Sequence, residues 1–136
     1  MSRKRPRQRR RRPRSGDAAR ACVMDRTGAP LAVNVVRADR WLSRVVGLMF
    51  RSRLEPGEAL WIPRCSAVHT CFMRFRIDLV FLDESLRVTR IAESVGPFRA
   101  RYGGRQARSV LELAAGTASR LGLRAGDRVS VTRSDR

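Results

Sequence analysis

The sequence contains no long hydrophobic run, and none of its apolar stretches approaches the roughly 18–20 residues that a membrane-spanning helix requires. No apolar segment follows the basic run at the start of the chain, so residues 15–24 do not resemble the core of a secretory signal. Three cysteines, an odd number, do not suit a disulfide framework and indicate a reducing compartment. These absences predict a cytoplasmic protein without a membrane span.

Acidic residues are scarce, with 12 against 30 basic ones, which gives a formal net charge of +18. The imbalance is strongest in residues 1–14, which hold nine basic side chains and no acid. Such a segment cannot bury enough apolar surface to offset the entropy of ordering. We therefore expect residues 1–17 to be a disordered arginine-rich tail and residues 18–134 a single domain. The predicted partner of residues 1–14 is nucleic acid or another polyanion, bound non-specifically.

Short β-type runs separated by turn residues dominate the rest of the chain. Two of them, 21–24 and 31–36, flank a turn with glycine and proline and predict a hairpin. From residue 75 to residue 81 the odd positions are all apolar, a pattern typical of a strand with a buried face. Further short strands are expected at 60–62, 86–95, 110–113 and 129–132.

Two short helices complete the pattern. The first begins at Asp39, after which apolar residues recur at helical spacing along one face. The second begins at Gly116 or Thr117 and ends at Gly122, a residue type suited to the left-handed position after a helix. Because strands and helices do not alternate, we predict a mainly β (α+β) domain: a small closed or semi-closed β-barrel of about seven short strands with two short helices packed on it.

The single histidine lies between two cysteines, and thiolates and imidazole are zinc or copper ligands. On a strand, however, Cys65 and His69 would lie about 13 Å apart at ~3.3 Å per residue, and on a helix Cys71 would point away from both. No metal or other cofactor is therefore predicted. A Cys71–His69 nucleophile pair is the catalytic alternative, but no oxyanion-hole motif surrounds it, so no catalytic residue is assigned. In the structural alternative the cysteines are small core residues and His69 is hydrogen-bonded.

Asp78 lies in the most apolar strand of the chain, where its carboxylate needs hydrogen-bond donors. It is either a buried carboxylate that organises the fold or a polar group at the mouth of a pocket. Glu112, inside the apolar run 110–113, raises the same question. For a pocket, the candidate binding residues are its near neighbours in the sequence together with Asp78 itself: His69, Thr70, Met73, Arg74 and Asp78.

From residue 38 onward the chain carries a series of motifs, of which the longest is the segment 69–83, HTCFMRFRIDLVFLD. The other pieces are GLMFR at 47–51, GEALW at 57–61, Pro97, VLELAAG at 110–116 and GLRAGD at 122–127. In this order the motifs resemble the DUF192 family. The resemblance implies a small β-rich domain of bacteria and archaea with no established biochemical activity. Many family members carry a secretory signal, whereas this chain carries an arginine-rich tail instead.

The sequence thus predicts a non-enzymatic ligand-binding or accessory domain with a polar pocket near His69 and Asp78. Two alternatives stay open. One is an enzyme that uses cysteine and histidine or a metal, with Asp78 as the orienting carboxylate. The other is a nucleic-acid accessory protein that acts through residues 1–14. No helix-turn-helix pattern and no aromatic pair at the spacing of an RNA-binding sheet accompanies the tail.

Overall fold

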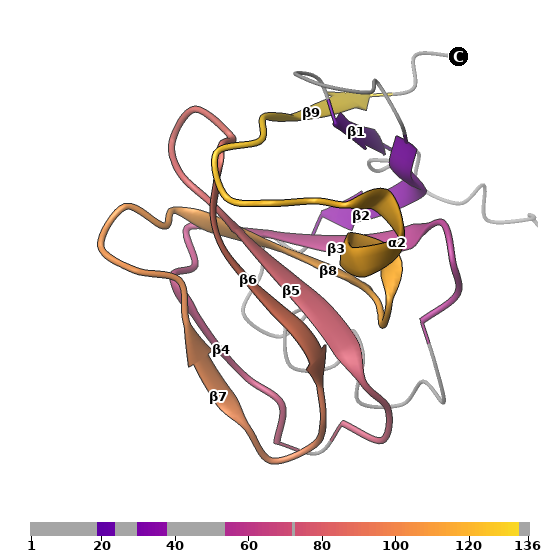
Figure 1. Ribbon diagram of the computed structural model, residues 1–136, viewed down its shortest axis with the longest axis vertical. Coiled ribbons are helices and arrows are strands. Elements are labelled where there is room, and N and C mark those ends of the chain that lie inside the picture. The colour runs from indigo at the N-terminus through magenta and orange to yellow at the C-terminus, as the bar shows by residue number, and fades with distance from the viewer. Residues whose placement is uncertain (1–18, 24–29, 38–53, 72, 134–136) are drawn as a thin grey trace, which may run out of the picture.

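The computed structural model describes residues 19–23, 30–37, 54–71 and 73–133. These ranges contain nine strands and one short helix (Figure 1), which are β1 (Ala19–Val23), β2 (Pro30–Arg37), β3 (Glu58–Pro63), β4 (Ala67–His69), β5 (Ile77–Leu82), β6 (Val88–Val95), β7 (Ala100–Tyr102), β8 (Ser109–Ala114), α2 (Thr117–Leu121) and β9 (Val129–Arg133). No helix in these ranges is long and apolar enough to cross a bilayer.

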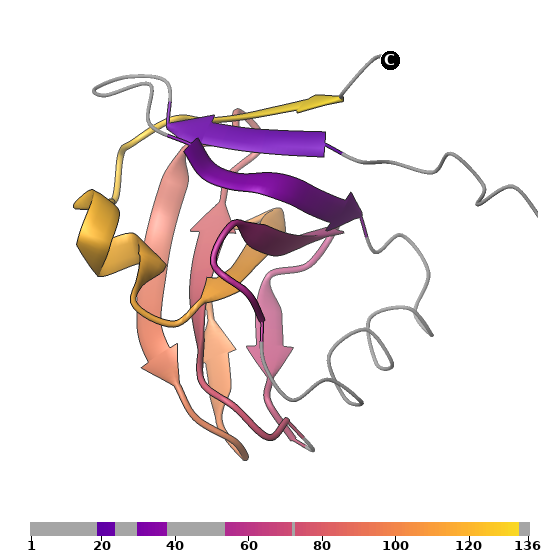
Figure 2. The same cartoon turned by 90° about the vertical axis from the view of Figure 1, so that its right-hand side faces the viewer.

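A seven-stranded sheet in the order β6-β5-β8-β3-β2-β1-β9 forms the body of the fold, and β4 and β7 form a separate two-stranded sheet. Each of the seven strands predicted from the sequence overlaps one strand of the larger sheet, which confirms the mainly β assignment. The predicted hairpin is also confirmed, because β1 and β2 pair antiparallel. β2 and β3 pair in parallel, and β1 also pairs with β9. Figure 2 shows β9, β1 and β2 lying across one end of the longer strands.

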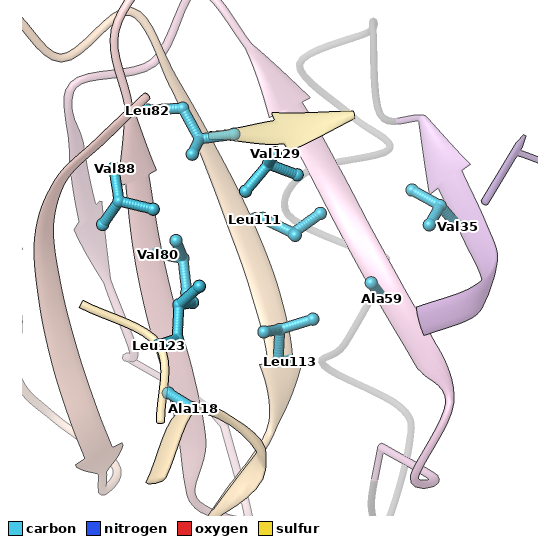
Figure 3. Packing of buried hydrophobic residues seen from close by; sticks show 10 residues of the cluster. All are labelled: Val35, Ala59, Val80, Leu82, Val88, Leu111, Leu113, Ala118, Leu123 and Val129. Atoms are coloured by element: carbon cyan, nitrogen blue, oxygen red, sulfur yellow. The ribbon is translucent and has the colours of Figure 1, made fainter. Parts of the chain in front are cut away.

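The two central strands, β5 and β8, are buried along their whole length. Because side chains alternate between the faces of a strand, these strands separate two hydrophobic clusters. The helix-side cluster (Figure 3) consists of Val35, Ala59, Val80, Leu82, Val88, Leu111, Leu113, Ala118, Leu123 and Val129. The ribbon-side cluster consists of Leu54, Leu60, Ile62, Met73, Ile77, Leu79, Phe81, Val95, Ala107 and Val110, with Val68 of β4 packed against it.

The second predicted helix is confirmed as α2. It lies between two glycines in the left-handed region, Gly116 with φ 89° and Gly122 with φ 61°. The amide of Gly122 donates to the Ser119 carbonyl at 3.1 Å, and the Leu123 amide donates to the Ala118 carbonyl at 2.9 Å. These bonds satisfy carbonyls at the end of the helix that have no partner inside it. The first predicted helix, from Asp39, lies outside the described residues.

Within the ranges that the structure describes, the sheets are not closed into a barrel, so the closed form of the predicted barrel is not what the structure shows. Across the described residues, the end strands β6 and β9 meet near one isolated bridge between Arg87 and Arg128. There the Val88 amide donates to the Asp127 carbonyl at 2.8 Å. Beyond this point β9 pairs with β1 and β6 pairs with β5, so the two end strands diverge.

The small sheet is fixed to the large one at Gly103, directly after β7. Its amide donates to the Ser66 carbonyl at 2.8 Å, and its carbonyl accepts from the Thr89 hydroxyl at 3.1 Å. A Cβ at this position would lie 2.4 Å from the Phe81 ring and 2.7 Å from the Cβ of Ala107. The backbone therefore approaches the core more closely than a side chain would allow.

We expect Gly103→Ala to lower the free energy of unfolding by about 1–3 kcal/mol, because the added methyl group overpacks the core against Phe81. Urea denaturation followed by circular dichroism measures the change. Gly96→Ala is the matched control, since a Cβ there would meet the Arg76 side chain at an ordinary contact distance of 3.6 Å. Equal stability of the two variants would contradict the close approach at Gly103.

Candidate functional site

Thr70 connects two loops from within the interior of the protein. Its side chain is fully buried, and its hydroxyl donates to the Gly96 carbonyl at 2.6 Å while accepting the Arg99 amide at 2.9 Å. Its own amide donates to the Arg99 carbonyl at 2.8 Å. Its carbonyl accepts the amides of Met73 at 3.2 Å and Phe98 at 3.1 Å. Thr70 therefore holds the loop that follows β4 against the loop that precedes β7.

Asp78 is also fully buried, and both of its carboxylate oxygens accept backbone hydrogen bonds. One oxygen accepts the amide of Ser94 in β6 at 2.8 Å, and the other accepts the amide of Ala118 in the first turn of α2 at 2.9 Å. Asp78 thus joins three elements, since it belongs to β5 itself. This is the arrangement expected of a carboxylate that organises the fold.

The remaining candidate pocket residues are divided between the surface and the core. His69 and Arg74 are exposed, whereas Met73 is buried in the ribbon-side cluster. The Asp78 carboxylate contacts α2, on the side of the helix-side cluster. The structure therefore brings His69, Thr70 and Met73 together along one segment and places the Asp78 carboxylate elsewhere. A pocket shared by all five residues stays a prediction.

Cys65 and Cys71 are partly buried. The Cys65 thiol donates to the Ala67 carbonyl at 3.1 Å. Within the described ranges, no three or more His, Cys, Asp or Glu side chains are grouped so that they could hold a metal ion. The Asp78 oxygens are occupied by the amides of Ser94 and Ala118, so this carboxylate is not positioned to orient His69. The arrangement therefore gives the catalytic alternative no orienting carboxylate at Asp78.

Glu112 is a buried acid whose pKa is strongly raised. It lies in β8 between Leu60 of β3 and Leu79 of β5, and it is 4% exposed. Burial raises the pKa of Glu112 to about 8, because the charged carboxylate loses its hydration among apolar neighbours. The side chain is therefore mostly protonated at neutral pH. The sequence raised the question of a buried acid here but gave no measure of this shift.

A strongly basic surface surrounds the small sheet, which lies beside the lower half of β5 and β6 in Figure 1. We call it the arginine ribbon and define it as β4, β7 and their flanking residues within 64–71, 73–76 and 96–108. It contains no acid, and all of its arginines are exposed: Arg64, Arg74, Arg76, Arg99, Arg101, Arg105 and Arg108.

The arginine ribbon also presents two large aromatic side chains, Phe98 and Tyr102, which are 70% and 51% exposed. Neither residue is among the predicted site residues, because the sequence predicts no strand or helix between residues 95 and 110. One signal in the sequence does point to this surface: the segments 64–76 and 96–108 hold seven arginines and no acid.

Over the residues that the structure describes, the fold defines a small β-rich domain with one short helix against its sheet. The family model of DUF192, described as "Uncharacterized ACR", matches residues 22–131, and the chain belongs to this family, as its motifs predict.

Two solved structures share the fold. One is a protein of unknown function from Novosphingobium aromaticivorans DSM 12444, with a TM-score of 0.71 and 25% identity over 82% of this chain and 83% of that chain. The other, from Sinorhizobium meliloti 1021, is described as a candidate transcription regulator, with a TM-score of 0.71 and 25% identity over 83% of this chain and 91% of that chain. A search of curated proteins gave no match.

Proposed function

We propose that this domain is a non-enzymatic binding module for polyanions and that the arginine ribbon is its binding surface. The observation that carries the proposal is the concentration of charge. The segments 64–76 and 96–108 hold seven arginines and no acid, whereas the other residues between 54 and 133 hold six arginines and eight acids. The positive charge of this part of the chain is therefore concentrated in one structural unit.

Exposed arginines of this kind suit a phosphate or sulfate polymer. Each contact releases condensed counterions, so that affinity arises from many cations without a shaped pocket. His69 and Arg74, two of the predicted pocket residues, belong to this surface, and the bonds of buried Thr70 hold its loops together, whereas the Asp78 carboxylate bonds to α2 on the helix side. The description of the Sinorhizobium protein as a candidate transcription regulator makes nucleic acid one member of this ligand class.

Replacing Arg99, Arg101 and Arg105 together by glutamine should weaken binding of the full chain to heparin and to random-sequence DNA. Fluorescence anisotropy over a series of salt concentrations measures this. The slope of log K against log salt should become shallower by roughly 0.9 for each DNA phosphate contact that is lost. The matched control is the triple change to glutamine at Arg120, Arg124 and Arg128, which are exposed arginines outside the arginine ribbon.

Equal effects of the two triple variants would contradict the arginine ribbon as the binding surface. Deleting residues 1–14 tests the tail in the same assay. If the tail is a second anchor, the deletion weakens binding further. If it is only a solvated extension, the full and shortened chains bind alike, and the effect of the ribbon variant is unchanged.

A further inference from the structure

Exposed aromatic rings distinguish the arginine ribbon from a merely basic surface. Phe98 and Tyr102 are the large hydrophobic side chains that remain exposed in the described part of the chain, and they lie four residues apart around β7. Burying such a ring is normally favourable. Two exposed rings on one short strand and its loop therefore indicate a surface that is covered when its ligand binds.

The backbone of Phe98 is held in an unfavourable conformation that presents this ring. Its φ of 56° lies in the left-handed region, which a bulky residue rarely adopts. The Phe98 amide donates to the carbonyl of buried Thr70 at 3.1 Å, and the next amide, of Arg99, donates to the Thr70 hydroxyl at 2.9 Å. The buried threonine thus fixes the position of the exposed phenylalanine before any ligand arrives.

Tyr102 shares its face of the small sheet with the single histidine. The register pairs Tyr102 with Ala67 and Ala100 with His69. Because alternate residues of a strand share a face, these four lie on the side opposite Val68, which packs against the ribbon-side cluster. The outer face therefore carries an aromatic ring and an imidazole at diagonal positions, with two small alanines beside them.

We infer that the preferred ligand of the arginine ribbon is single-stranded nucleic acid, with bases stacked on Phe98 and Tyr102 and phosphates on the exposed arginines of the arginine ribbon. This inference rests on the polyanion binding proposed above and narrows it. Sequence-tolerant single-strand binding combines a cationic surface with exposed aromatic rings, because every base has a flat face. Paired bases in a duplex cover these faces, so a duplex gains only the phosphate contacts.

The test compares a single-stranded oligo-dT of about twelve nucleotides, a duplex of the same length and heparin, each bound to the full chain at fixed salt. The variant is Phe98→Asn with Tyr102→Thr. Asparagine tolerates a positive φ and threonine suits a strand, so the fold should survive, which circular dichroism checks. Stacking on an aromatic ring raises binding affinity roughly five- to hundredfold per base, so the affinity of the double variant for the single strand should be at least tenfold lower. Affinity for the duplex and for heparin should change by less than about threefold, because their phosphate and sulfate contacts remain.

The matched control, Arg120→Gln with Arg124→Gln, should leave the preference for the single strand unchanged. If the aromatic double variant loses affinity equally for the single strand and the duplex, or loses affinity for neither, the stacking role is overturned. Heparin and duplex binding without a single-strand preference would overturn this inference alone and leave the polyanion proposal standing. Failure of the full chain to bind any of the three ligands would instead overturn the proposed function.

Discussion

Raising the pH from about 5 to about 9 is expected to destabilise the folded chain through Glu112 by roughly 4 kcal/mol. The folded pKa of about 8 lies above the ordinary value of 4.5. Between these values the folded carboxyl keeps its proton and the unfolded one has lost it. The contribution of Glu112 to the free energy of unfolding is therefore fully present below pH 4.5 and is lost as the pH rises through about 8.

Glu112→Gln removes this group, and the variant should lose far less stability than the wild type as the pH rises. Urea denaturation of both proteins at about pH 5, 7 and 9 measures the difference, which should grow in favour of the variant. Comparing the two proteins cancels the titration of all other groups. Glu84→Gln serves as the control, because Glu84 is exposed. A difference between Glu112→Gln and wild type that does not change with pH would contradict the shifted pKa.

The second large effect is expected at Asp78, whose replacement by alanine should cost about 3–5 kcal/mol of unfolding free energy. The substitution leaves the amides of Ser94 and Ala118 without acceptors in the interior, at about 1–3 kcal/mol for each unsatisfied group. It also loosens α2 and β6 from β5 at once. Thermal and urea unfolding measure the loss.

Asp83 provides a matched comparison for Asp78. Its carboxylate also accepts two backbone amides, those of Ser85 at 2.8 Å and Arg87 at 2.9 Å, but in an exposed turn. Water can replace the lost acceptor there, so Asp83→Ala should cost only about 1 kcal/mol. Similar losses for Asp78→Ala and Asp83→Ala would show that burial does not determine the effect. Asp78 is a buried acid whose oxygens accept backbone amides, whereas Glu112 is a buried acid between apolar neighbours.

Much of the large sheet could be predicted because its signals are local. β5 has a run of apolar residues at alternating positions, and α2 lies between two glycines that permit the left-handed conformation. The roles of the buried acids are not local. The amides that donate to Asp78 belong to Ser94 and Ala118, 16 and 40 residues further along the chain. The sequence therefore predicts that a buried Asp78 needs donors but does not show which residues provide them.

The candidate site was harder to predict for the same reason. β7 consists of three exposed residues and has no buried position, so the periodicity that identifies a half-buried strand is missing. Next to the pairing of β7 with β4, the Thr70 hydroxyl bonds to carbonyls 26 and 29 residues away, in the loop before β7. The sequence predicts His69 and Arg74 as pocket residues because they lie near Asp78 along the chain, whereas the surface around them is formed by the distant segment 96–108. Phe98 gives no sign in the sequence of its positive φ.

The position of β1 between β2 and β9 bears on the order in which the chain folds. Ala19 pairs with Arg133, so strands from the two ends of the described chain lie side by side. Closing so long a loop costs conformational entropy before any contact compensates it. The paired residues of β1 and β2 are close in the sequence, so this hairpin can form early. The pairing of β1 with β9 can form only after most of the sheet is in place. This outer seam is therefore where the domain would complete its folding last and begin to open first.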